Sequence, residues 1–187
     1  MIAIILAGGK SSRLGGGKEK TLIKIGGKRL IDLVVESVRE SKAEDFLVAI
    51  TKNTPKTAEY CKHVNYKIIE TPRRGYHEDL RYLLARYPEF VSIASDIPFL
   101  KAEHINAIID FYNDFGNSNS ITGAVPRDIV PSYVIPAYVF EYESRKLIAV
   151  GLNVVTEGRK DLPFIFNDPL LAININTPRD LEIAKKV

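Results

Sequence analysis

Sulfur and imidazole ligands are scarce in this sequence of 187 residues. Its one cysteine, Cys61, has no second cysteine with which to form an internal disulfide. The three histidines, His63, His77 and His104, do not have the spacing of a Cys/His zinc site. These absences favour a protein of the reducing cytoplasm without a thiolate or imidazole metal centre.

Long apolar runs are absent as well. The apolar N-terminus covers only residues 1–6 and lacks a basic segment before it, so it does not fit a secretory signal. No stretch approaches the length of about 20 apolar residues that a membrane-spanning helix needs. We therefore expect a cytoplasmic protein with no membrane span.

Charge of one sign is also not in large excess. The formal net charge is +3, and the basic residues are spread along the chain rather than clustered. This balance favours a small anionic ligand over a nucleic-acid partner. No linker or repeat divides the chain, and 45% of its residues are hydrophobic, so we predict one domain over residues 1–187. A homodimer is compatible with the sequence, which specifies no oligomeric state.

The most informative stretch is the N-terminal strand with the loop that follows it. Residues 1–6 are apolar throughout, which is typical of a strand buried on both faces of a parallel sheet. Residues 7–20 contain five glycines together with Arg13, Lys18 and Lys20. Glycines let the backbone approach a ligand closely, and the cations neutralise a polyphosphate. Because ligands of open α/β sheets bind at the carboxyl ends of strands, the loop predicts a phosphate site.

Two common phosphate-binding motifs are missing from this loop. The sequence G-x-x-x-x-G-K-[ST] does not occur, because Lys18 is followed by Glu19 and Ser12 stands where the first glycine should be. The dinucleotide motif G-x-G-x-x-G is absent too. The loop is therefore neither a P-loop nor a dinucleotide fingerprint, and a solvated surface loop is the alternative interpretation.

Apolar runs alternate with helical patterns over residues 1–116. Further strands are predicted at 45–51, 66–70 and 89–94, and helices at 30–38, 54–62, 77–87 and 101–115. Thr54 is expected as the N-cap of the second helix, with Pro55 at its first position. This alternation predicts an α/β fold: a three-layer α/β/α sandwich with a Rossmann-like, mostly parallel sheet.

The pattern is less regular over residues 117–187. Strands are predicted at 121–125 and 133–140, confined to edges or bulges by Pro126, Pro131 and Pro136. A last apolar strand is predicted at 170–175, before a helix at 179–186. We expect residues 1–116 to form the half that holds the phosphate site, and residues 117–187 to form the closing half.

Asp96 follows the predicted strand 89–94, so its carboxylate should face the same crevice as the glycine loop. Mg2+ takes a carboxylate together with phosphate oxygens and water, and needs no cage of protein ligands. An N-cap for the following segment is the alternative role for an aspartate at this position.

The first loop resembles that of the nucleotidylyltransferases related to molybdenum cofactor guanylyltransferase. Their signature L-A-G-G-x-x-x-R-[ML]-G, followed by K-x-L, corresponds here to residues 6–15 and 20–22. The resemblance implies the nucleotide-diphospho-sugar transferase fold and a loop that wraps a nucleoside triphosphate, with nucleotide contacts from Leu6, Ala7, Gly8, Gly9, Arg13 and Lys20. Gly17 or Lys18 is extra relative to the usual spacing. Either Lys18 or Lys20 therefore meets the phosphates, and we assign Lys20.

Two more motifs match the same family. Asp96 lies in a D-x-P motif that holds the metal in family members, which favours Mg2+ over capping. The stretch 174–181 resembles N-x-N-T-P-x-D-L, which lies beside that metal. Alternation along a strand places Asn174 and Asn176 on one side, and we assign Asn176 as the second ligand, with helix capping as its alternative role.

Three further blocks, at 53–57, 75–80 and 151–155, resemble one branch: the archaeal-type adenosylcobinamide-phosphate guanylyltransferases. The resemblance covers nearly the whole chain. It implies guanine recognition near Asn53, Glu78 and Asp79, and an acceptor role near Gly151 and Asn153. Residues 1–116 would then be the nucleotide-binding half, and residues 117–187 the acceptor-binding and closing half. Acidic residues in a first helical turn also suit the helix dipole, which is the structural alternative for Glu78 and Asp79.

The implied activity is transfer of GMP from GTP to adenosylcobinamide phosphate in cobalamin biosynthesis, with Arg13, Lys20 and Asp96 as the catalytic residues and Mg2+ as the cofactor. The partners would be GTP and a phosphorylated corrinoid. Two kinds of alternative stay open. One is nucleotidyl transfer to molybdopterin or to a sugar or polyol phosphate, and the other is a non-catalytic nucleotide-binding domain.

Overall fold

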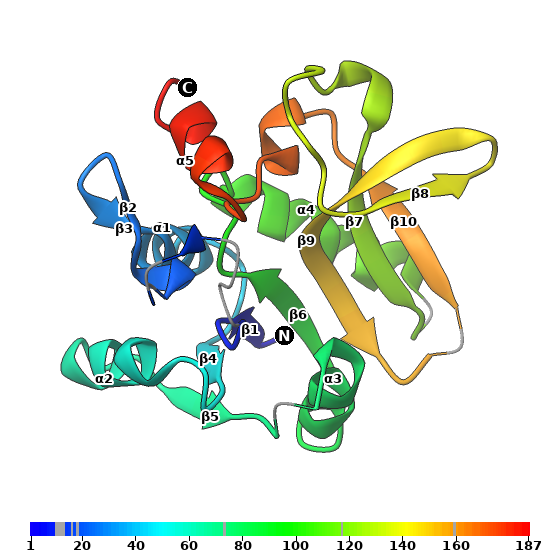
Figure 1. Cartoon of the computed structure of the whole chain (residues 1–187). Helices are drawn as coiled ribbons and strands as arrows, with labels where there is room; N and C mark the ends of the chain where they lie inside the picture. The colour runs from blue at the N-terminus through cyan, green and yellow to red at the C-terminus, as the bar shows by residue number, and fades with distance from the viewer. Residues whose placement is uncertain (10–13, 16, 18, 73, 117, 159) are drawn as a thin grey trace.

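The computed structural model describes every residue except 10–13, 16, 18, 73, 117 and 159 (Figure 1). Its main sheet contains the strands β1 (Ala3–Leu6), β4 (Phe46–Ile50), β5 (Ile68–Glu70), β6 (Glu89–Ala94), β7 (Ser120–Pro126), β8 (Val139–Tyr142), β9 (Arg145–Thr156) and β10 (Asp161–Ile165). The strand order is β10-β7-β9-β6-β1-β4-β5, and β8 pairs with β9. A small hairpin is formed by β2 (Lys24–Ile25) and β3 (Lys28–Arg29).

The first half of the sheet is parallel and lies as the sequence predicts. β1 pairs in parallel with both β4 and β6, and β4 pairs in parallel with β5. Ile4 and Ile5 of β1 are fully buried, because successive side chains point to opposite faces and each face is covered. β1 is therefore central in the sheet, and its carboxyl end lies beside the carboxyl end of β6.

Helices cover both faces of this half. They are α1 (Leu30–Arg39), α2 (Pro55–His63), α3 (Tyr76–Leu84), α4 (Ala102–Phe111) and α5 (Pro178–Ala184). Short turns complete the fold: η2 (Lys20–Leu22), the π-helical η3 (Tyr112–Gly116), η4 (Arg127–Ile129) and η5 (Pro169–Ala172). The predicted helices all exist, although the one expected at 77–87 ends at Leu84. None of the helices in the described part of the chain is long and apolar enough to cross a bilayer.

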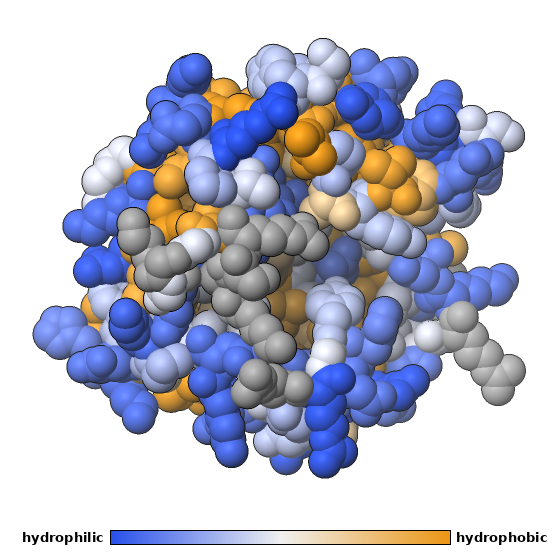
Figure 2. All heavy atoms as spheres, in the orientation of Figure 1, coloured by the Kyte–Doolittle hydropathy of each residue, from blue (hydrophilic) through white to orange (hydrophobic). Residues whose placement is uncertain are grey.

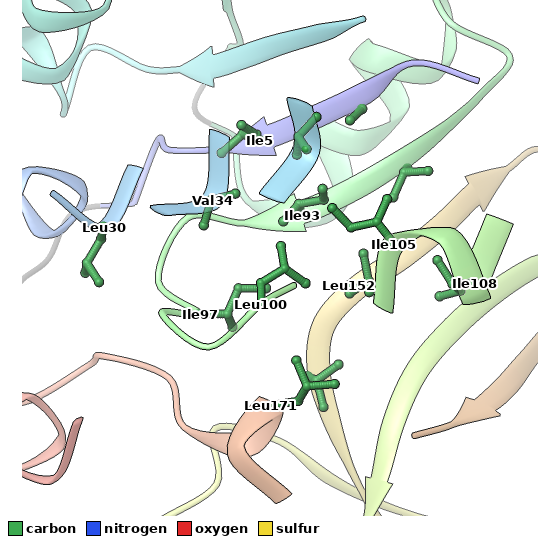
Figure 3. Packing of buried hydrophobic residues seen from close by; sticks show 14 of the residues in the cluster. Ile5, Leu30, Val34, Ile93, Ile97, Leu100, Ile105, Ile108, Leu152 and Leu171 are labelled. Carbon is green, nitrogen blue, oxygen red and sulfur yellow. The ribbon is translucent and has the colours of Figure 1, made fainter. Parts of the chain in front are cut away.

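Two clusters of buried side chains hold the layers together. The larger joins α1 and α4 to one face of the sheet, where Ile5, Val34, Ile93 and Ile105 pack together (Figure 3). The smaller lies on the opposite face, where Leu83 of α3 packs with residues of β1, β4 and β6. The three-layer α/β/α sandwich is confirmed.

The second half of the sheet differs from the prediction. β9 is antiparallel to β6, β7 and β8, whereas β10 is parallel to β7, so the sheet is mixed, with parallel pairs in the majority. The sequence pattern missed β9 and β10. β9 lacks strict alternation and contains Gly151, which interrupts a strand pattern.

Two predicted strands are wrong. Residues 133–138 are irregular and only 139–142 form a strand, because Pro131 and Pro136 supply no N–H and restrict the backbone. Residues 169–172 form η5 rather than part of a strand at 170–175. Asp168 caps that turn by accepting from the Leu170 N–H at 3.0 Å, and Pro169 fits its first position.

Candidate active site

Three segments that are distant in the sequence meet beyond the carboxyl ends of β1 and β6. Lys20 comes from η2, Asp96 follows β6, and Asn176 precedes α5. The Lys20 ammonium donates to Asp96 Oδ2, and also to Asn176 Oδ1 at 3.1 Å. The side chains of Lys20 and Asp96 are 18% and 10% exposed, so the ion pair is largely shielded from water. A shielded ion pair has a stronger electrostatic effect than one on the surface.

The segment around Asn176 is held by backbone contacts and by a buried carboxylate. The Ile175 N–H donates to the Asp96 carbonyl at 2.9 Å, which ties this segment to the end of β6. Asp180 Oδ2 accepts from the N–H groups of Asn176 at 3.0 Å and Thr177 at 2.7 Å. The Thr177 hydroxyl accepts in turn from the Asp180 N–H, which completes a capping box on α5. The N-T-P-x-D sequence therefore fixes the position of Asn176.

A cavity of about 570 Å³ lies next to Lys20 and Asp96. It fits the hollow near the centre of Figure 2, beside the atoms drawn in grey. The lining comes from the ends of β1, β4, β5 and β6, the start of α3, and Lys20; it comprises Leu6, Ala7, Gly8, Gly9, Lys20, Thr21, Ala49, Thr51, Asn53, Thr54, Thr71, Arg74, Gly75, Tyr76, Asp79, Leu80, Ala94, Ser95 and Asp96. Its volume is in the range usual for small-molecule sites.

The structure brings most of the predicted nucleotide residues to this cavity. Residues 6–9, Lys20, Asn53 and Asp79 all line it. Glu78 is not among the lining residues, and its Oε1 pairs with Arg81 at 2.5 Å on the exposed side of α3. Arg13, like the alternative lysine Lys18, lies outside the described residues.

The sequence reasoning did not select Thr51, which lies at the end of β4 as Asp96 does at the end of β6. Its Oγ1 donates to the Gly8 carbonyl at 2.9 Å and accepts from the Asn53 N–H at 3.1 Å. A Cβ on Gly8 would lie 2.5 Å from Thr51 Cγ2, so only glycine fits at that position. Thr51 thus joins the glycine loop to the wall that carries Asn53. The sequence feature that could have indicated Thr51 is its position directly after a buried strand.

The predicted acceptor residues lie on β9, next to the cavity rather than in it. Gly151 has φ +80°, and a Cβ there would lie 2.8 Å from that of Ala94, so β9 approaches the end of β6 closely. Asn153 is paired with Ser92 of β6 on one side and Thr122 of β7 on the other. Cross-strand partners share a face of the sheet, so these three polar side chains form a row.

Three buried side-chain oxygens in this region lack a hydrogen-bond partner among the described residues: Ser92 Oγ, Asp96 Oδ1 and Asn174 Oδ1. Asn174 and Asn176 are half-buried on either side of Ile175, which is fully buried. Unpartnered carboxylate and amide oxygens suit a hard divalent cation, which takes oxygen ligands. The described residues contain no cluster of three or more His, Cys, Asp or Glu side chains, so such a cation would rely on ligand oxygens as well.

Comparisons with known proteins agree with this geometry. The sequence profile of the MobA-like NTP transferase domain matches residues 3–150. The adenosylcobinamide-phosphate guanylyltransferase of Methanocaldococcus jannaschii is 34% identical over 197 residues, covering 99% of this chain and 96% of the relative. A probable molybdenum cofactor guanylyltransferase of Natranaerobius thermophilus is 27% identical, covering 98% and 94%.

The fold is shared with solved nucleotidyltransferases. A CMP:2-keto-3-deoxy-manno-octonic acid synthetase, solved with CTP, superimposes with a TM-score of 0.71 at 16% identity, over 99% of this chain and 96% of that chain. At this identity the similarity shows the nucleotide-diphospho-sugar transferase fold and no more.

Proposed function

This chain belongs to the family of MobA-like NTP transferase domains, and from that premise we propose that it transfers GMP from GTP to adenosylcobinamide phosphate. The observation that carries the proposal is the meeting of Lys20, Asp96 and Asn176 at the edge of a nucleotide-sized cavity. The full-length relative of M. jannaschii supports this choice of donor and acceptor.

The reaction is a displacement at the α-phosphorus of GTP. A phosphate oxygen of the acceptor forms the new P–O bond while the bond to the β-phosphate breaks, and pyrophosphate leaves. A phosphate monoester has a second pKa of about 6, so the nucleophile is already anionic and needs no general base. The protein has to align two anions and neutralise their charge.

Among the described residues, Lys20 is a cation placed for that task. It lies at the edge of the cavity with two oxygen partners, so its ammonium is oriented before the substrate arrives. We assign Lys20, together with Arg13 of the glycine loop, to the triphosphate. The backbone of Gly8 and Gly9 provides close approach to the nucleotide.

We assign Asp96 to Mg2+, with Asn176 as the second ligand from the sequence prediction. Asp96 Oδ1 is available for a metal because it has no donor among the described residues. Asn174 Oδ1 has the same property, whereas Asn176 Oδ1 accepts from Lys20. Asn174 is therefore the competing ligand. A bound Mg2+ would supply positive charge to the phosphate oxygens during transfer.

Guanine recognition is assigned to the wall formed by residues 51–54 and the first turn of α3. Asp79 lines the cavity, and a carboxylate can accept from both N–H groups on the Watson–Crick edge of guanine. Asn53 lines the same cavity and offers an amide. The role of Glu78 in base recognition stays a prediction; its carboxylate pairs with Arg81 on the outer side of α3.

The acceptor is assigned to residues 117–187, on the face of β9 that carries Gly151 and Asn153. Leu152 and Val154 are fully buried in the cluster that includes α4, so Asn153 points to the opposite face. Asn153 is half-buried on that face. Thr122 in the same row donates to the Asp161 carboxylate at 2.8 Å. The row is polar, which suits an acceptor with amide groups at its rim.

A second candidate function is guanylyl transfer to molybdopterin, favoured by the relative of N. thermophilus. Transfer to a sugar or polyol phosphate would use the same Lys20 and Asp96. A non-catalytic nucleotide-binding domain is disfavoured, because binding alone does not need a shielded lysine and a carboxylate with a vacant oxygen at the phosphate end.

The test is pyrophosphate release from each of the four nucleoside triphosphates with Mg2+, with and without adenosylcobinamide phosphate. We expect release from GTP only when the corrinoid is present. Pyrophosphate release only with molybdopterin or a sugar phosphate would identify one of these as the acceptor instead. Tight GTP binding without release with any acceptor would favour the non-catalytic alternative.

A further inference from the structure

Glu19 reaches from the end of the glycine loop to the N-terminus of α2. Its Oε1 accepts from the Lys56 N–H at 2.8 Å, and its Oε2 accepts from the Thr57 N–H at 2.6 Å. A helix start leaves such N–H groups without partners inside the helix and attracts negative charge. Glu19 therefore caps α2 although it lies 37 residues before Lys56.

The residue at the N-cap position does not provide this cap. Thr54 occupies that position, as the sequence predicts, but its side chain makes no capping bond to α2. Its hydroxyl faces back to Thr51, donating to the carbonyl at 3.2 Å. The expected local cap is thus replaced by a carboxylate from another segment.

A chain of hydroxyl groups strengthens the contact. Thr57 Oγ1 lies 2.5 Å from Glu19 Oε2 and 2.6 Å from Thr21 Oγ1. An ionised carboxylate only accepts, so Thr57 donates to Glu19, and Thr21 must donate to Thr57. Thr57 is fully buried and Thr21 is 3% exposed. The directions of these bonds are therefore fixed.

Lys20 lies between the two residues that are held in this way. Glu19 and Thr21 are both fastened to α2, so the backbone of Lys20 has little freedom to move away from Asp96. We propose that Glu19 is a positioning residue that fixes Lys20 at the phosphate end of the cavity. The proposal rests on the proposed function, in which Lys20 binds the triphosphate.

The same contact joins the two ends of the nucleotide site. Asn53 and Thr54, which line the cavity on the side assigned to the base, directly precede α2. Glu19 holds the start of α2 and the start of η2 together. Together with the contact between Thr21 and Thr57, Glu19 thus helps to set the spacing between the base and phosphate subsites.

The experiment is a double-mutant cycle in which Glu19→Ala and Lys20→Ala are made singly and together. The control is Glu59→Ala, which removes an exposed carboxylate from the same helix. Steady-state kcat, KM for GTP, the Kd of Mg-GTP without acceptor, and Tm are measured for each. Glu19→Gln is included because it keeps the shape of the side chain but points an NH2 group at an N–H donor.

We expect Glu19→Ala to lower kcat by about 10- to 100-fold, as a misplaced catalytic group does. In the Lys20→Ala background the same change should lower kcat by less than about threefold, because residues that act through one another are not additive. Glu19→Gln should fall between Glu19→Ala and the wild type. Glu59→Ala should stay near the wild type.

The proposal would be overturned if the effects of Glu19→Ala and Lys20→Ala on kcat were fully additive. It would also be overturned if Glu19→Ala lowered Tm but left kcat and KM unchanged, which would make Glu19 a helix cap only. If Glu19→Ala does not fold, Glu19→Gln takes its place in the cycle. If the wild type transfers nothing to any acceptor, the proposed function fails. The double-mutant cycle is then evaluated on the Kd of Mg-GTP, which does not depend on transfer. Non-additive losses of GTP affinity would support the positioning role of Glu19, and additive losses would contradict it.

Discussion

Replacing Gly8 by alanine tests how closely the glycine loop is packed against Thr51. The new Cβ would lie 2.5 Å from Thr51 Cγ2, a separation that real side chains do not tolerate. Thr51 is 5% exposed and holds the Gly8 carbonyl and the Asn53 N–H, so it cannot move without loss of those bonds. Overpacking of this kind costs about 1–3 kcal/mol of unfolding free energy.

For a chain of this size, that loss lowers Tm by about 2–12 °C. The assay is thermal unfolding followed by circular dichroism, together with the Kd of GTP, which should rise because Asn53 shifts with Thr51. Gly9→Ala is the matched control, since a Cβ there meets no heavy atom of the described residues within 4 Å. Its unfolding free energy should change by less than about 0.5 kcal/mol. Equal Tm values for the two variants would refute the packing argument.

Three further predictions concern the site and its pH dependence. Asp96→Ala should lower Mg2+-dependent kcat by at least about 10²-fold while the protein stays folded; near-normal activity would refute the metal assignment. Asp79→Asn should raise the KM for GTP relative to ATP, measured by pyrophosphate release, because an amide cannot accept both guanine N–H groups; an unchanged ratio would exclude Asp79 from base recognition. Burial lowers the pKa of the His104 imidazole below its ordinary 6.5. The unfolded chain then binds the proton more tightly, so unfolding free energy should fall as pH drops below about 6.5. His104→Gln should flatten that fall in a series of urea titrations, and an identical pH profile would contradict it.

The parallel half of the fold could be predicted because its strands are buried on both faces. Residues 1–6 are apolar throughout and residues 89–94 are largely apolar, which favours short buried strands. The carboxyl-end rule then placed Asp96 beside the glycine loop. Lys20 and Asp96 are 76 residues apart, yet both follow from that rule and the family signature. The site residues of this half could be predicted because they lie where the strands end.

The second half could not be predicted in the same way. The apolar residues at 170–172 are as suitable for a strand as for the turn they form, and the Asp168 cap with Pro169 decided the outcome. β9 carries Gly151 and the half-buried Asn153 inside its apolar stretch, and these two residues interrupted the strand pattern. Glu19 was missed for another reason: its contact with α2 is tertiary, and capping patterns are local.

The most direct test of the proposed reaction follows the label from GTP. The protein is incubated with Mg2+, adenosylcobinamide phosphate and GTP labelled with radioactive phosphorus at either the α or the γ position. Attack at the α-phosphorus predicts that the α label enters the corrinoid product and that the γ label leaves as pyrophosphate. A γ label in the corrinoid, or neither label there, would contradict guanylyl transfer to this acceptor.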